Sequence, residues 1–165
     1  MRKILMTVST LMALSAPALA AEKAPGPTSL GVFSDWTAAE YSAGGAHVCY
    51  AFTRAIGSAK IPTAAMIIVS ERAGSRDEVV VNATAPYPAK SEVAFQVDDQ
   101  PPMSFYSSGS RAYSRDGRAS VIDMQKGNGA SAAWALKDGH KHAEKFSLAG
   151  FSAAYGAIVK ACPAK

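Results

Sequence analysis

The chain has 165 residues, of which 48% are hydrophobic and 18% are charged, and this composition excludes a disordered tail or a low-complexity array. Its length favours a single domain. The formal net charge of +4 would suit a nucleic-acid or anionic membrane partner, but two of the positive charges lie in an N-terminal segment that we expect to be removed.

Residues 1–20 have the three parts of a secretory signal peptide. Two basic residues precede a short apolar run over 4–14, and small residues surround a cleavage site after Ala20. The apolar run is shorter than the roughly 20 residues that span a bilayer, and no later stretch is apolar and long enough to do so. We therefore predict export to the periplasm or cell surface, with no transmembrane segment after cleavage.

The exported chain begins with a predicted flexible leader at 21–29, which contains two prolines and a glycine. Residues 30–165 are expected to form one domain. Cleavage removes two of the 17 basic residues and none of the 13 acidic ones, so the net charge falls to +2. Export also argues against a nucleic-acid partner. The remaining positive charge is concentrated in residues 111–165.

Short segments rich in β-branched and aromatic residues follow, with turns rich in Gly, Ser and Pro between them. This pattern predicts an antiparallel, mainly β architecture. The segments are 32–41, 47–53, 64–70, 78–84, 91–97, 103–107 and 111–114. Residues 118–126 predict a short helix, and 131–137 with 142–148 predict a hairpin over Asp138-Gly139.

The end of the chain changes to a helical period. Apolar residues recur at steps of three and four, which predicts a terminal helix with one buried stripe. Ser147 is the expected N-cap and Pro163 the expected stop. The stripe consists of Leu148, Phe151, Tyr155, Ile158 and Cys162.

Cys49 and Cys162 are the only cysteines, and both lie in the exported part. An even count in an oxidising compartment indicates one disulfide. Such a bond would close a loop of 113 residue steps and stabilise the fold by up to about 5 kcal/mol. Two free thiols in a metal or catalytic role are the alternative, although no Cys-x-x-Cys or Cys-x-x-His spacing supports it.

The sequence contains few motifs that indicate metal binding, catalysis or cofactor binding. His140 and His142 would share one face of an extended segment, which makes them weak candidates for a metal site, but two ligands are too few. The sequence has no nucleophile elbow, phosphate loop or dinucleotide fingerprint. We therefore expect no catalytic residues, no cofactor and no enzymatic activity. Trp36 and Trp134 are assigned to the core.

A cationic and aromatic cluster is the main candidate for a binding surface. Arg111, Arg115 and Arg118 flank Tyr113, a mixture typical of surfaces that bind anions or protein partners. Solvated side chains on an exposed hairpin would give the same pattern, so this alternative stays open.

The exported chain resembles the invasion-associated locus B family of proteobacterial periplasmic or surface proteins. The resemblance rests on LGVFSDW at 30–36, HVCYAF at 47–52, AMIIVSER at 65–72 and FSLAGFSAAYGAIVKAC at 146–162. It implies an immunoglobulin-like antiparallel β-sandwich with a C-terminal α-helix, and a disulfide between Cys49 and Cys162. The family has no established catalytic residues to transfer, and its name refers to host-cell invasion by a pathogen.

The expected function is therefore a non-enzymatic binding or envelope-associated role. The partner would be an envelope or host-surface protein, a glycan or a lipid. The alternatives are an envelope enzyme assembled from residues distant in sequence, and a redox or stress-linked periplasmic factor that uses the cysteine pair.

Overall fold

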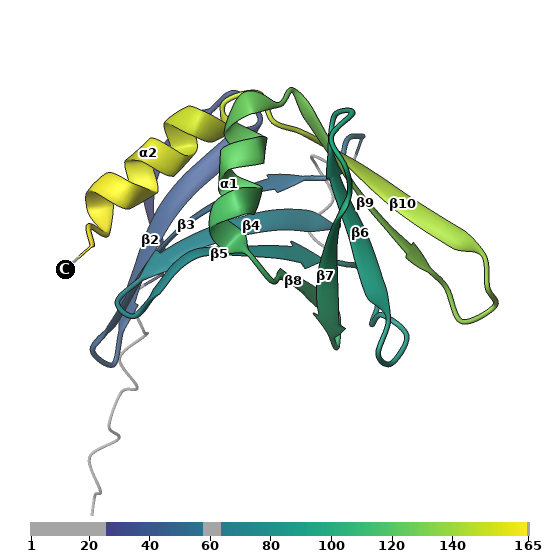
Figure 1. The fold of residues 1–165 in the computed structure, drawn as a ribbon. Coiled ribbons are helices and arrows are strands. Elements are labelled where there is room, and N and C mark those ends of the chain that lie inside the picture. Colours follow the sequence, from purple (N-terminus) through teal and green to yellow (C-terminus); the bar gives the residue numbers. More distant parts are fainter. Residues whose placement is uncertain (1–25, 58–63, 165) are drawn as a thin grey trace, which may run out of the picture.

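The structure is a computed structural model that describes residues 26–57 and 64–164. The expected signal peptide and the first five residues of the leader lie outside the described residues. Within these residues the fold is one antiparallel sheet of ten strands with two helices (Figure 1). The strands lie in the order β1-β2-β3-β4-β5-β8-β7-β6-β9-β10.

In chain order the elements are β1 (Thr28–Phe33), β2 (Trp36–Ala43), β3 (Ala46–Arg54), β4 (Met66–Arg72), β5 (Ser75–Asn82), β6 (Glu92–Val97), β7 (Met103–Ser108), β8 (Arg111–Ser114), α1 (Gly117–Lys126), β9 (Gly129–Ala135), β10 (Lys141–Ser147) and α2 (Phe151–Ala161). These elements confirm the predicted fold class, which is mainly β and antiparallel with a C-terminal helix. The short helix and the hairpin that follows it also lie where they were predicted.

The first predicted segment, 32–41, proves to be two strands. The chain reverses at Ser34 and Asp35, and β1 then pairs with β2 as a hairpin. Ser34 has a φ of 51°, the left-handed conformation that a tight turn requires and that the alternation of apolar residues does not reveal. β1 also begins at Thr28, so the last two residues of the predicted leader belong to a strand.

The sheet bends so that β10 reaches the start of β2 and the end of β3. The backbone N–H of Ile56, just after β3, donates to the carbonyl of Lys145 in β10 over 2.8 Å. Trp36 Nε1 donates to the Ser147 carbonyl over 3.0 Å. The two halves of the sheet therefore enclose one core in a sandwich-like arrangement, although they are parts of one continuous sheet.

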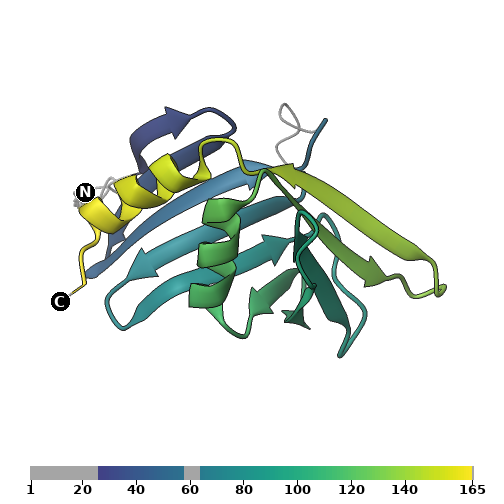
Figure 2. The ribbon, with the colours of Figure 1, turned by 45° about the horizontal axis from the view of Figure 1, so that its top comes forward.

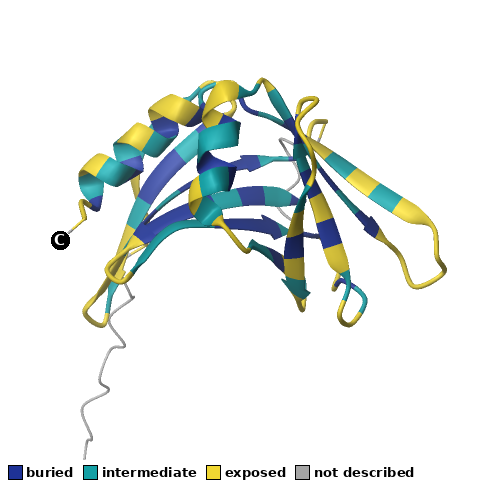
Figure 3. Ribbon diagram, in the orientation of Figure 1, coloured by how far each residue is buried: buried dark blue, intermediate teal, exposed yellow. Residues whose placement is uncertain are grey.

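Both helices cover the same face of the sheet, which we call the inner face (Figure 2). Buried and exposed residues alternate along the strands because successive side chains point to opposite faces (Figure 3). The inner positions form a single apolar core that includes Trp36, Ile67, Phe95, Trp134 and Phe146. Both tryptophans are therefore core residues, as predicted.

Helix α2 begins differently from the prediction. Its N-cap is Gly150 rather than Ser147, with a φ of 90° and no side-chain cap. A Cβ at Gly150 would lie 1.9 Å from the Phe33 carbonyl oxygen, so only glycine fits this contact. The Ser147 hydroxyl instead accepts a hydrogen bond from the Ala149 N–H over 3.2 Å. Phe151 and Ile158 are buried, as the apolar stripe predicted.

Neither helix in the described part of the chain has the length and apolar character needed to cross a membrane.

Candidate functional site: the outer face of the sheet

Five apolar side chains form a row across the face opposite the helices, which we call the outer face. Cross-strand pairing places them opposite one another in the order Phe52 (β3), Ile68 (β4), Val80 (β5), Tyr113 (β8) and Tyr106 (β7). We call these five residues the apolar row. Neighbouring strands lie about 4.8 Å apart, so the row is about 19 Å long.

Aromatic rings pack against one another at both ends of the apolar row. The rings of Tyr106 and Tyr113 stack with their centroids 5.4 Å apart, and Tyr50 stacks against Phe52 at 6.2 Å. Tyr106 is 43% exposed, whereas Val80, at the middle of the row, is only 6% exposed. The Tyr106 end of the row is therefore far more exposed than its middle.

Other apolar side chains extend this surface. Val32, Tyr41 and Tyr106 are the large hydrophobic residues that lie exposed within strands of the described chain, and all three are on the outer face. An exposed apolar residue is ordinary when it stands alone, but apolar residues gathered on one face indicate a contact surface.

Arginines lie over both ends of the row. The Arg54 guanidinium is 5.3 Å from the centroid of the Phe52 ring, and that of Arg115 is 5.4 Å from the Tyr106 ring. Arg115 also pairs with Glu92 over 2.6 Å. Arg54 has no acidic partner among residues 26–57 and 64–164, and its Nε is buried without a hydrogen-bond partner there.

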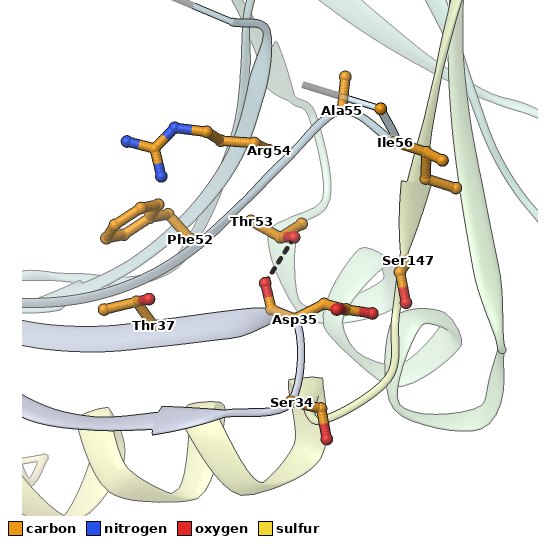
Figure 4. Close-up of a pocket in the computed structure, with 10 residues that line it drawn as sticks. Ser34, Asp35, Thr37, Phe52, Thr53, Arg54, Ala55, Ile56 and Ser147 are labelled. Carbon is orange, nitrogen blue, oxygen red and sulfur yellow. Dashed lines mark hydrogen bonds between the residues drawn. The ribbon is translucent and has the colours of Figure 1, made fainter. Parts of the chain in front are cut away.

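A pocket of about 490 Å³ lies at the Phe52 end of the row. Thr37, Phe52 and Arg54 line one side of it, and the Asp35 carboxylate points away from them, toward Ser147 (Figure 4). The Thr53 hydroxyl donates to the Asp35 carbonyl over 2.8 Å and holds the turn in place. The pocket therefore presents a guanidinium beside an aromatic ring.

A second hollow, of about 380 Å³, lies beyond the Tyr106 end of the row. Its floor contains Ala94 and Ala133, and Glu92, Ser104 and Lys141 also line it. These residues come from neighbouring strands, β6, β7, β9 and β10. The outer face thus has a hollow at each end of the apolar row.

The predicted cationic cluster is divided by the structure. Arg111 and Tyr113 lie on the outer face in β8, and Arg115 follows them against Tyr106. Arg118 lies elsewhere, because it belongs to α1. Its guanidinium is 3.7 Å from the Asp77 carboxylate and 3.4 Å from the hydroxyl of a tyrosine in α2. Only three of the four predicted residues therefore share a surface.

The two histidines of the predicted metal pair have different surroundings. His142 packs on the Trp134 ring with centroids 4.7 Å apart, and its Nε2 lies 3.0 Å from Glu144. His140 is exposed in the turn before β10. Neither belongs to a group of three potential ligands within the described residues.

Cys49 and Cys162 are joined by a disulfide, with their Cα atoms 5.9 Å apart. The bond joins β3 to the end of α2, and both cysteines are buried. The Nε2 of His47 lies 3.8 Å from each sulfur. The three side chains are spaced like metal ligands, but sulfurs bonded to each other are not the thiolates that a metal prefers.

A buried acidic network lies near the disulfide. Glu71 is fully buried and accepts a hydrogen bond from the Asp77 N–H, while Arg76 Nε lies 2.6 Å from its carboxylate. Loss of hydration, reinforced by the nearby Asp77 carboxyl, outweighs this attraction and raises the pKa of Glu71 to about 7. The Tyr155 hydroxyl donates to Asp77, and burial raises its pKa as well.

This network holds α2 against the β4–β5 hairpin. Arg76 Nη1 also donates to the carbonyl of Cys162 over 2.6 Å, so the network and the disulfide fix the same end of the helix. A hollow of about 420 Å³ beside them is lined by His47, Arg76 and Cys162, but neither Glu71 nor Asp77 lines it. The network is thus placed to support structure rather than to meet a ligand.

No protein family model matches the sequence, and no curated protein matches it. Among solved structures, the chain is similar to the crystal structure of invasion associated protein B from Bartonella henselae. The two share 14% sequence identity with a TM-score of 0.59, over 79% of this chain and 95% of the other. At this identity the similarity shows a shared fold.

Proposed function

We propose that the chain is an exported envelope protein of the invasion-associated locus B family that acts by binding a partner and catalyses no reaction. The observation that carries this proposal is the outer face, where an apolar row lies between two hollows and has an arginine over each end. A surface of this kind is typical of a recognition site.

Three further observations support export and the family. The N-terminal sequence has the pattern of a secretory signal peptide. A buried disulfide is typical of proteins that fold in an oxidising compartment. The fold matches that of invasion associated protein B. If the organism is a pathogen, the same similarity favours a role in host-cell invasion.

The buried acidic groups favour binding over catalysis. Glu71, the described carboxyl whose pKa is raised, lies inside the fold and lines none of the hollows described above. A catalytic carboxyl would have to reach a substrate. The outer face, by contrast, combines arginines and aromatic rings, which are the residue types that contribute most to binding energy.

Cell fractionation combined with cross-linking tests this proposal. The wild-type protein should appear in the envelope fraction, shortened by the signal peptide, and should capture a partner. Arg54→Glu combined with Arg111→Glu should abolish capture without changing the amount exported. Lys160→Glu, on the solvent side of α2, is the matched control and should capture normally. Retention in the cytoplasm, or equal capture by both variants, would contradict the proposal.

A further inference from the structure

We propose that the outer face binds an acidic oligosaccharide, a chain of sugar rings bearing carboxylate or phosphate groups, laid along the apolar row. This inference rests on the proposed binding function and specifies the chemistry of its partner. It is carried by the charge of the outer face, by the shape of the row, and by the composition of its centre.

The charge of the outer face is strongly positive. Side-chain alternation and register place six cations on it, against two carboxylates, an excess of four positive charges. The cations are Arg54, Arg72, Arg111, Arg115, Lys141 and Lys145, and the carboxylates are Glu78 and Glu92. The whole exported chain carries only +2, so the outer face is more cationic than the rest. This asymmetry complements an anionic partner.

Four of these cations are available to a ligand. Arg72 pairs with Glu78 over 2.7 Å, and Arg115 pairs with Glu92 over 2.6 Å. The other four have no ion-pair partner in the part of the chain that the structure describes. They are Arg54, Arg111, Lys141 and Lys145. They lie on β3, β8 and β10, so they span the sheet instead of forming one compact anion site.

The shape of the surface favours an elongated ligand. The apolar row extends about 19 Å across five neighbouring strands, and each end leads to a hollow. Arg54 enters the first hollow beside Phe52, and Lys141 lines the second. A single small anion would leave most of this surface uncovered, whereas a chain of several sugar rings would follow the row from one hollow to the other.

The composition of the row favours sugars over nucleobases. Ile68 and Val80, at its centre, are aliphatic and offer no ring on which a base could stack. The apolar C–H face of a sugar ring can pack on aliphatic and aromatic groups alike. Val80, at the centre of the row, is only 6% exposed, so little apolar surface is free there to enter a lipid bilayer. An acidic oligosaccharide therefore fits better than a nucleic acid or a membrane.

Calorimetric titration of the exported chain with a hexamer of galacturonic acid tests the inference. We expect binding that weakens as salt is added, because the contacts are ionic. Arg54→Ala and Arg111→Ala should each weaken binding about tenfold, since charge-assisted hydrogen bonds are lost. Lys160→Ala, on α2, should bind like the wild type, and neutral maltohexaose should not bind.

The opposite results would overturn the inference. These are an absence of binding to the acidic hexamer at low salt, or equal binding by the wild type and both arginine variants. Tighter binding of a deoxythymidine dodecamer or of phosphatidylglycerol vesicles through the same arginines would reassign the ligand class. Thermal unfolding of each variant verifies that it is folded, and the two arginine variants serve as independent tests.

The outcomes separate this inference from the proposed function. If the double arginine variant loses its partner in cells but no acidic sugar binds in solution, the binding function stands and the ligand class is wrong. If the acidic hexamer binds in solution but the protein is not exported, the chemistry of the outer face stands and the envelope function is wrong.

Discussion

Ile67 and Ile68 are neighbours in β4, yet they belong to surfaces with different roles. Ile67 points to the inner face, where it is fully buried in the core under α2. Ile68 points to the outer face, where it forms part of the apolar row and is only partly buried. Under the proposed binding function, hydrophobicity in this sheet serves stability on one face and recognition on the other.

The charged groups differ between the two faces in the same way. On the inner face, Glu71, Arg76 and Asp77 contact one another and are enclosed by the helices. On the outer face, Arg54 and Arg111 have no acidic partner among the described residues. Changes on the inner face should therefore alter the free energy of unfolding, and changes on the outer face should alter binding.

Removing the disulfide should have the largest effect, and the effect should be confined to stability. Cys49→Ala combined with Cys162→Ala releases the end of α2 and restores the entropy of a loop of 113 residues in the unfolded chain. We expect the free energy of unfolding in urea to fall by about 3 to 5 kcal/mol. Ligand binding by the folded fraction should persist. An unchanged unfolding midpoint would contradict the structural role of the bond.

Substitutions at Ile67 and Ile68 should affect stability and binding differently, because the two side chains lie on opposite faces of the sheet. Ile67→Ala opens a cavity in the core and should lower the free energy of unfolding by about 3 kcal/mol. Ile68→Ala removes a partly exposed side chain and should cost only about 1 kcal/mol, while it weakens partner binding. Chemical denaturation and binding measured on both variants check this. Equal destabilisation by the two substitutions would mean that the outer face is also core.

The inner face should be sensitive to pH through Glu71. Because burial raises its pKa from 4.5 to about 7, the folded state holds this proton more tightly than the unfolded state does. The stabilisation is fully present below pH 4.5 and is lost as the pH rises toward 7. A shift of this size corresponds to about 3 kcal/mol.

Glu71→Gln should remove this part of the pH dependence. The difference in unfolding free energy between the variant and the wild type, measured from pH 4 to pH 8, isolates it from other titrating groups. The variant should gain stability relative to the wild type as the pH rises. Parallel pH profiles would show that folding does not raise the pKa of Glu71.

The smallest predicted effect is a gain of stability on the solvent side of α2. Gly156 lies within the helix, is exposed, and would meet no neighbouring atom if it carried a Cβ. Gly156→Ala should therefore raise the free energy of unfolding by up to about 1 kcal/mol, with no change in binding. Reduced stability would show that this side of α2 packs against another part of the protein. A change in binding would show that the partner contacts α2 as well as the outer face.

The fold class could be predicted from the sequence because local patterns encode it. Short segments rich in β-branched and aromatic residues, separated by turn residues, predicted most strands, and steps of three and four predicted α2. The N-cap at Gly150 could not be predicted, because its reason is a close approach to Phe33, more than one hundred residues away in the chain. The hairpin at Ser34 was missed because the apolar pattern continues through the turn.

The candidate site was predicted only in part. Three residues of the predicted cluster around Tyr113 lie on the outer face, but spacing along the chain also suggested Arg118, which the turn into α1 carries to Asp77. Phe52 and Ile68 were predicted to lie in strands, but the side of the sheet on which they lie was not predicted. The sequence did contain a signal for an apolar outer face. A strand that buries only one face needs apolar residues at every second position, but segments 47–53 and 64–70 have apolar residues on both faces. The order of the strands, which aligns the row, depends on long-range pairing.

Photo-cross-linking in intact cells tests most directly whether the outer face is the binding surface. A photoreactive residue placed at Tyr106, on the outer face, is compared with one at Ala153, exposed on α2. The account predicts a high-mass adduct from position 106 and none from position 153. An adduct from position 153 alone, or equal adducts from both positions, would contradict it.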